Sequence, residues 1–191
     1  MASLFSRKSF EIGALVQSGR QALIKRDFAK ALSHFEEVAK KAPGYIYKAA
    51  HFSEGIWTYV GRTQYATGHL QVAQQSLGHA LTISPQDHLA RLYLGMTLIR
   101  GGGQERGVVE LKNAMQGLYD WIEDIVASRP FEAFWDPNKQ IRNELQKTIT
   151  MVTDLNADRS EIIASAEWLG QEIEEEIERA RRDESRQYQH E

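Results

Sequence analysis

Apolar residues recur at intervals of three and four residues along most of the chain, as on the buried face of an α-helix. The clearest of these faces lie in the second half, over residues 111–125, 141–155 and 162–177. Asp158, with Glu161 three residues later, is typical of a capping box at the start of the last helix. No stretch alternates convincingly between apolar and polar residues, as a half-buried strand would. The pattern therefore predicts an all-α fold.

A repeated set of small and large residues divides the first part of the chain into three segments that align on a glycine. Gly61 and Gly95 lie 34 residues apart, and Gly19 is the corresponding residue of the first segment. A glycine and a small residue let two helices approach closely, and a large apolar residue fills the space between them. Each segment is thus predicted to be a helical hairpin. The small residues are Ala31, Ala73 and Gly107, 12 positions after the glycines, and the large ones are Phe35, Leu77 and Leu111, 16 positions after them.

Glycines and prolines fall where such hairpins need them. Gly68 and the run 101–103 lie where the two helices of a hairpin should be joined, and glycine suits the positive φ of such turns. Pro43 and Pro85 follow the second helix of the first and second hairpins, where proline ends a helix. Residues 46–53 interrupt the array, and we expect them to form a helix extension or a loop.

The second segment carries Trp57, Val60, Gly61, Ala73, Leu77, Ala80 and Pro85. With this spacing it resembles a tetratricopeptide repeat (TPR). The first segment has Leu15 in place of the tryptophan, and the third departs from the pattern at Arg91 and Tyr119. The resemblance implies a TPR-type helical-hairpin solenoid with copies at residues 12–45, 54–87 and 88–121.

Helical patterns continue beyond the repeats, so we divide the chain into repeats over 1–121 and a helical C-terminal extension with a polar tail over 122–191. The last helix of the third repeat should run on to about residue 127. The open end of a repeat array exposes an apolar face, and we expect the extension to cap it. Its predicted anchors are Phe131, Phe134 and Trp135, and its predicted packing face is Ile141, Leu145 and Ile149.

The composition excludes several classes of chemistry. The chain has 191 residues and no cysteine, which rules out disulfides, thiolate metal sites and thiol nucleophiles. A formal net charge of −3 gives no reason to expect nucleic-acid binding. No apolar run is long enough to cross a membrane, and the start of the chain lacks the apolar stretch of a secretory signal. We expect a soluble, cytoplasmic protein.

Candidate catalytic and metal-binding groups lack the spacing that their chemistry needs. None of the six histidines lies three or four residues from another, so no helical face carries a pair of imidazole ligands. The glycine run 101–103 is not followed by the Lys-Ser/Thr of a phosphate-binding loop. The acidic block 172–178 has no glycine turn of a calcium loop. We therefore predict no enzymatic activity, no cofactor and no metal site.

The TPR resemblance also implies a concave groove, lined by the first helix of each repeat, in which partners usually bind as extended peptides or helices. Here the groove is mainly apolar, with two arginines one repeat apart whose geometry suits an acidic partner. The cage of lysine, asparagine and arginine that grips chaperone tails in this family is absent. We expect an adaptor or scaffold that binds a peptide or helix of a partner protein. The predicted groove consists of Val16, Arg20, Leu23, Thr58, Arg62, Tyr65, Leu92, Met96, Ile99 and Arg100.

Two other functions stay open at this point: a structural subunit that self-associates into a homo-oligomer, and a groove that holds a small molecule. The groove residues of the third repeat also have an alternative, which is burial under the chain's own C-terminal helices.

Charge is unevenly divided along the chain. Residues 1–121 contain 14 Lys+Arg and 9 Asp+Glu, a net of +5, whereas residues 122–191 contain 9 and 17, a net of −8. We hypothesise that the final helix lies along or near Arg20 and Arg62 through Glu172, Glu175, Glu176 and their neighbours, and screens the groove until an acidic partner competes. The alternative is an acidic face that is simply solvated.

Overall fold

The computed structural model describes residues 2–49, 52–128, 135–154 and 157–187. This part of the chain is mostly helical, as predicted, with a single two-stranded sheet. The helices are α1 (Ala2–Ile24), α2 (Phe28–Lys41), α3 (Ile56–Ala66), α4 (Leu70–Ile83), α5 (His88–Arg100), α6 (Gln104–Ser128), α7 (Gln140–Thr153) and α8 (Arg159–Gln187), and the strands are β1 (Ile46–Ala49) and β2 (Phe52–Gly55).

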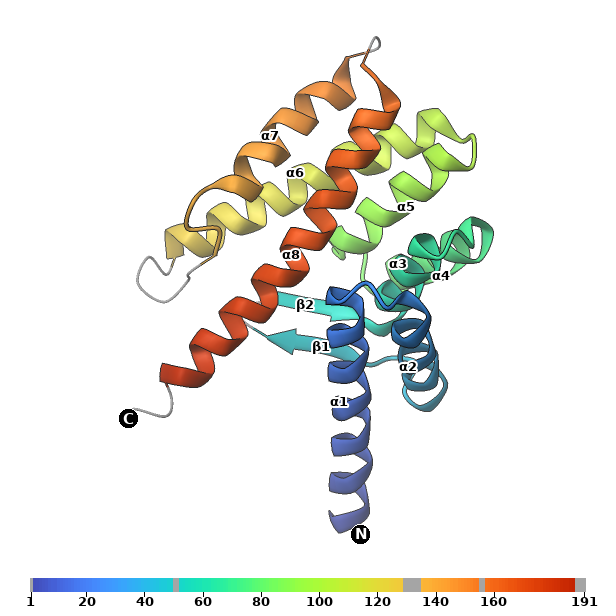
Figure 1. Ribbon diagram of the computed structural model, residues 1–191, viewed down its shortest axis with the longest axis vertical. Helices are drawn as coiled ribbons and strands as arrows, with labels where there is room; N and C mark the ends of the chain where they lie inside the picture. Colours follow the sequence, from blue (N-terminus) through green and yellow to red (C-terminus); the bar gives the residue numbers. More distant parts are fainter. Residues whose placement is uncertain (1, 50–51, 129–134, 155–156, 188–191) are drawn as a thin grey trace.

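The first six helices form three hairpins, α1–α2, α3–α4 and α5–α6, and each helix packs against the next along the chain (Figure 1). A Cβ added at Gly19 would lie 2.5 Å from the Phe35 ring, and one at Gly61 would lie 2.5 Å from Leu77 Cγ. A Cβ at Gly95 would meet Leu111 Cγ at 2.8 Å. The close approach that the repeated residues predict is therefore confirmed in all three hairpins.

The turns between paired helices use left-handed backbone, as predicted. Gly68 has φ +80° and Gly102 has φ +92°. In the first hairpin the corresponding residue is Arg26, with φ 59°, although a side chain makes this conformation unfavourable. Two of the hairpins therefore meet this backbone requirement with glycine, and the first meets it at an energetic cost.

The prediction that residues 46–53 form a helix extension or a loop is wrong. β1 and β2 form an antiparallel hairpin in which Tyr47 pairs with Glu54 and Ile46 with Gly55. Each strand has only four residues, which is too short for alternation to stand out. The buried residue next to Gly55 is also the charged Glu54, so hydropathy does not report which face points inward.

Aromatic packing joins the sheet to α6 and to Trp135, which precedes α7. Trp135, 2% exposed, meets Trp121 edge-on with ring centroids 4.8 Å apart, and Phe52 lies 5.4 Å from Trp121 in the same manner. The other two predicted anchors, Phe131 and Phe134, lie outside the described residues. Of the predicted packing face on α7, Ile141 and Leu145 are buried and Ile149 is partly buried.

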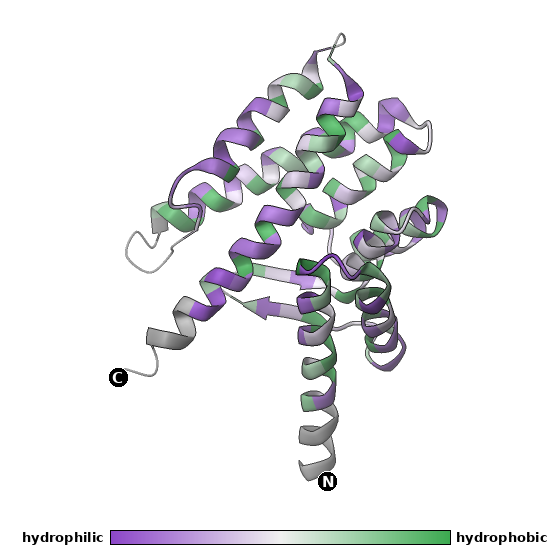
Figure 2. Cartoon of the chain, viewed as in Figure 1, coloured by the Kyte–Doolittle hydropathy of each residue, from purple (hydrophilic) through white to green (hydrophobic). Residues whose placement is uncertain are grey.

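The last two helices, α7 and α8, pack against different parts of the protein. α7 packs against α6, so it covers the end of the hairpin array, and α6 itself runs to Ser128, about as far as predicted. α8 then turns back and crosses α5, β1 and α1 (Figure 1). In Figure 2 its apolar positions alternate with strongly polar ones along its length. The apolar stripe predicted for this helix is fully buried: Ile162, Ala166, Leu169, Ile173 and Ile177.

We expect Gly95→Ala to destabilise the protein by about 2 kcal/mol, since overpacking in a rigid contact costs about 1–3 kcal/mol. The added methyl would meet the backbone nitrogen of Leu111 at 2.8 Å and the carbonyl oxygen of Gly107 at 2.9 Å, and neither atom can move away cheaply. The matched control is Gly78→Ala in α4, where nothing lies within 4 Å. It should stabilise the protein by up to about 1 kcal/mol through helix propensity. Urea unfolding of both variants tests this difference, and equal effects would contradict it.

Candidate functional site beneath and beside the last helix

The predicted groove residues lie together on the first helices of the three hairpins, but they do not line an open groove. Nine of the ten are buried, and only Arg100 keeps a half-exposed side chain. α8 contacts this surface directly, since Arg20, Arg62 and Tyr65 all make hydrogen bonds to it. The expectation of an accessible groove is therefore wrong for Val16, Arg20 and Thr58, and for Leu92, Met96 and Ile99 the alternative of burial is the correct one. Leu23, Arg62 and Tyr65 are also buried, but they line the cleft that remains.

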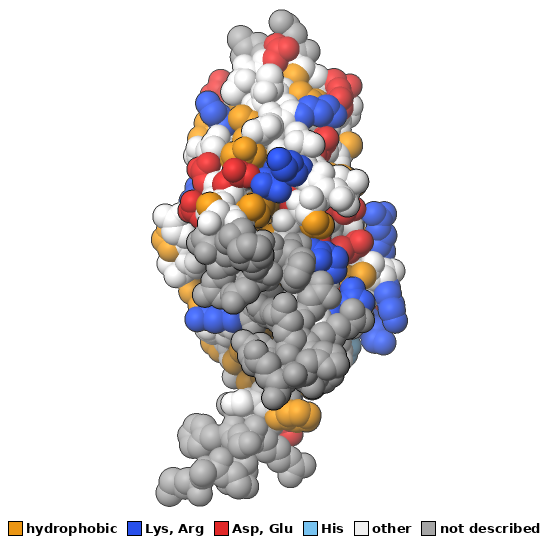
Figure 3. Space-filling view, turned by 90° about the vertical axis from the view of Figure 1, so that its left-hand side faces the viewer, with side chains coloured by type: hydrophobic (Ala, Val, Ile, Leu, Met, Phe, Trp, Pro, Cys, Tyr) orange, Lys and Arg blue, Asp and Glu red, His pale blue; other side chains and the backbone are white. Residues whose placement is uncertain are grey.

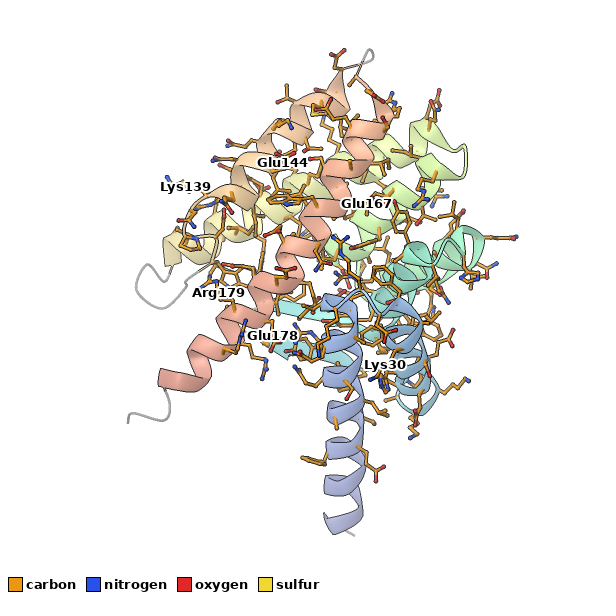
Figure 4. The ribbon with its side chains drawn as sticks, in the orientation of Figure 1. Lys30, Lys139, Glu144, Glu167, Glu178 and Arg179 are labelled. Carbon is orange, nitrogen blue, oxygen red and sulfur yellow. The ribbon has the colours of Figure 1, made fainter. Side chains whose placement is uncertain are left out.

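Arg20, on α1, is tied to α8 and to the sheet. Its Nε donates to Glu174 at 2.8 Å, and its Nη1 donates to Glu178 at 3.1 Å. The same Nη1 donates to the Tyr47 hydroxyl, whose ring lies 4.1 Å from the guanidinium carbon. Figure 4 shows Glu178 where α8 passes the sheet and α1.

Arg62, on α3, completes the network. Its Nη1 donates to Glu174 at 3.0 Å and to Glu54 at 3.1 Å, and its Nη2 donates to the carbonyl oxygen of Gly170 at 3.0 Å. Glu174 therefore accepts from Arg62 with one oxygen and from Arg20 with the other. These two arginines with Glu54, Glu174 and Glu178 form what we call the buried ion network.

The hypothesis that the acidic helix lies along Arg20 and Arg62 is correct in its placement, but the ion pairs are made by neighbours of the three glutamates that it names. Glu174 and Glu178 make the contacts, whereas Glu175 is exposed and Glu176 instead accepts from the backbone nitrogen of Asp136. The apolar stripe of α8 contains the signal for the right choice. Glu174 and Glu178 lie four and eight residues after the buried Gly170, in the row that starts at Ala166, so they lie on the buried side of the helix.

Burial dominates the electrostatics of the network. It raises the pKa of Glu54 to about 8, assisted by repulsion from Glu174 and Asp87 and opposed by Arg62. Burial works against the charge of Arg62, but Tyr93, Glu54 and Glu174 hold its pKa above the usual range. Both arginines thus stay charged, and at neutral pH Glu54 is the carboxyl group that carries a proton.

A glycine lets α8 come close enough to make these contacts. A Cβ on Gly170 would clash with the Tyr93 hydroxyl of α5, so only glycine allows this approach without displacement. Thr58, in contrast, forms a hydrogen bond to the residue that precedes α5. It donates at 2.6 Å to Asp87, which also caps α5 by accepting from the backbone nitrogen of Ala90.

Beside α8, a cleft of about 430 Å³ remains open on the same surface. Four predicted groove residues line it: Leu23, Arg62, Tyr65 and Arg100. Tyr65 donates to Glu167 at 2.6 Å, and Arg100 lies 3.6 Å from the same carboxylate. Glu172 and Glu175, which the charge hypothesis placed beside the groove, also line the cleft. Sequence reasoning missed Arg26, Phe28 and Trp168, because none of them lies on the first helix of a hairpin.

Other kinds of site find no support in the described ranges. No group of three or more His, Asp or Glu side chains in them could hold a metal ion. None of the helices, as far as they are described, combines the length and apolarity needed to cross a membrane. Figure 3 shows acidic, basic and apolar side chains interspersed on the side that carries α7. The cleft is therefore the candidate site that we pursue.

Comparisons with known proteins identify no relative of this chain. No protein-family model matches the chain, and no curated protein matches it.

We expect Glu174→Gln to destabilise the protein by about 3–5 kcal/mol, because the substitution leaves two buried guanidinium groups without their shared carboxylate. The matched control is Glu175→Gln, one residue away on the exposed side of α8, which should change stability by less than about 0.5 kcal/mol. Urea unfolding measures both. Similar effects of the two substitutions would mean that the buried ion network does not hold α8.

The pKa of Glu54 predicts a pH dependence. Folded Glu54 keeps its proton up to about pH 8, whereas the ordinary value is 4.5, so the folded state binds more protons between these values. Stability should therefore fall as pH rises through this window, with a slope of up to about 1.4 kcal/mol per pH unit from this residue. In Glu54→Gln this part of the slope should vanish. Thermal unfolding of both proteins from pH 5 to pH 8 tests this, and parallel curves would contradict it.

Proposed function

We propose that the chain is a TPR-type repeat protein that serves as a protein–protein interaction module and has no catalytic role. Its three hairpins support this proposal, since each has the same contact between a glycine and a large apolar residue 16 positions later. Left-handed turns at equivalent places support it as well. Repeat arrays of this kind present extended surfaces to other proteins.

One observation carries the functional part: the first helices of the hairpins already bind a helix, which is α8. The covered surface combines apolar side chains with two arginines, and α8 supplies the complementary stripe and carboxylates. A surface that recognises a helix of its own chain is suited to recognising protein. With α8 in place, the part that a foreign segment can reach is the open cleft.

A second candidate is self-association, and the N-terminal helix favours it. α1 has 23 residues and its partner α2 has 14, and the start of α1 projects from the body (Figure 1). Phe10 on this helix is 79% exposed, the most exposed of the large apolar side chains in the described part. Light scattering of the wild type and of Phe10→Ser separates this candidate from the first. A dimer that Phe10→Ser abolishes would favour it.

To test the interaction module, the tagged full-length protein is used to capture partners from the source cell. We expect Trp168→Ala with Arg100→Ala to reduce recovery of a specific partner at least fivefold, because both side chains line the cleft. The matched control is Val109→Ala, which removes an exposed apolar side chain on α6 outside the cleft. Equal recovery by all three proteins would contradict the proposed site.

A further inference from the structure

The two walls of the cleft carry opposite charge. The wall that α8 supplies has Glu167, Glu172 and Glu175 around Trp168, whose side chain is 38% exposed. The wall that the repeats supply has Arg26, Arg62 and Arg100. A ligand that lies between the walls therefore meets acceptors on one side and donors on the other.

Several of these groups have unused binding capacity. Within the described part of the chain, Arg26 and Glu172 form no ion pair, and Arg62 Nε is buried without a hydrogen-bond partner. Burial and repulsion from Glu175 and Glu176 raise the pKa of Glu172. A cationic group bound beside Glu172 would offset this repulsion. Arg100 and Glu167 are 3.6 Å apart and both 45% exposed, so their pair is weak enough for a ligand to replace.

The backbone conformation of Arg26 also supports a binding role for the cleft. At the equivalent positions of the other two hairpins stand Gly68 and Gly102, which adopt positive φ without strain. The first hairpin instead keeps a long cationic side chain there and places it on the rim of the cleft. An unfavourable conformation that persists beside a cavity is a reason to look for a role in binding.

We propose that the cleft binds a short segment of a partner protein in which an apolar side chain lies between an acidic and a basic one. This inference rests on the proposed function. Arg26 and Arg100 bind the carboxylate, Glu172 and Glu175 bind the cation, and Trp168 contacts the apolar side chain. A purely acidic segment would meet the α8 wall with like charge, and a purely basic one would meet the arginines. The volume of about 430 Å³ lies within the range of small-ligand sites.

The test uses the full-length protein and four capped pentapeptides: Ala-Glu-Leu-Lys-Ala, its neutral analogue with two glutamines, its doubly acidic analogue and its doubly basic analogue. The signal is the indole N–H resonance of Trp168, identified by its loss in Trp168→Phe. The mixed-charge peptide should shift this resonance with an affinity at least threefold higher than that of the other three. Raising the salt from 0.05 M to 0.5 M should remove the difference, since it screens exposed charges.

Two variants test the roles of the walls. Arg26→Gly should raise the midpoint of thermal unfolding, because glycine adopts positive φ without strain. The same substitution should lower the affinity for the mixed-charge peptide at least threefold. Glu175→Gln should lower the affinity for the same peptide to a similar extent. Binding that both variants leave unchanged overturns the inference, as does a neutral peptide that binds equally well.

The outcome also separates this inference from the function on which it rests. A cellular partner whose capture depends on Trp168 but not on Arg26 or Glu175 overturns the charge pattern and leaves the interaction module in place. If no captured protein depends on Trp168, and no peptide shifts its resonance, both are wrong.

Discussion

The rest of the structure depends on the neutralisation of two guanidinium groups inside the protein. Arg20 and Arg62 are 0% and 2% exposed, and a buried charge without a partner costs several kcal/mol. No single repeat supplies their partners: the hydrogen-bond acceptor Glu54 comes from the sheet, and the carboxylate of Glu174 lies 154 residues beyond Arg20. The sheet and α8 must therefore be in place before the first two hairpins can bury these side chains.

This constraint changes the role of the C-terminal extension. A cap covers one end of an array and can be exchanged for another polar surface, whereas α8 contributes a fully buried stripe and two buried glutamates to the centre of the molecule. Part of the excess positive charge in residues 1–121, and of the excess negative charge in residues 122–191, comes from the residues that form this pairing. Because the pairing is buried, salt should affect it less than it affects exposed pairs.

Local patterns predicted much of the fold, and the long-range part of the site escaped them for physical reasons. The glycine at each hairpin contact and the stripe from Ile162 to Ile177 both follow from spacing, so they could be predicted without knowing what packs against them. The apolar stripe of α8 indicates which glutamates are buried, but which arginines they meet depends on a partner surface that is far away in the sequence. The sheet was missed because its strands have only four residues each and one of their buried residues, Glu54, is acidic and pairs with Arg62.

The cleft follows from the same arrangement. Because α8 is held through Glu174, Glu178 and the carbonyl oxygen of Gly170, it crosses the first helices at a fixed place and leaves the region between Tyr65 and Trp168 open. One wall of the cleft therefore belongs to the repeats and the other to a segment far away in sequence. A binding surface built in this way exists only in the fully folded chain, so its specificity is coupled to the buried ion network. Loss of that network would remove the acidic wall as well as stability, whereas substitutions on the rim can weaken binding while α8 stays in place.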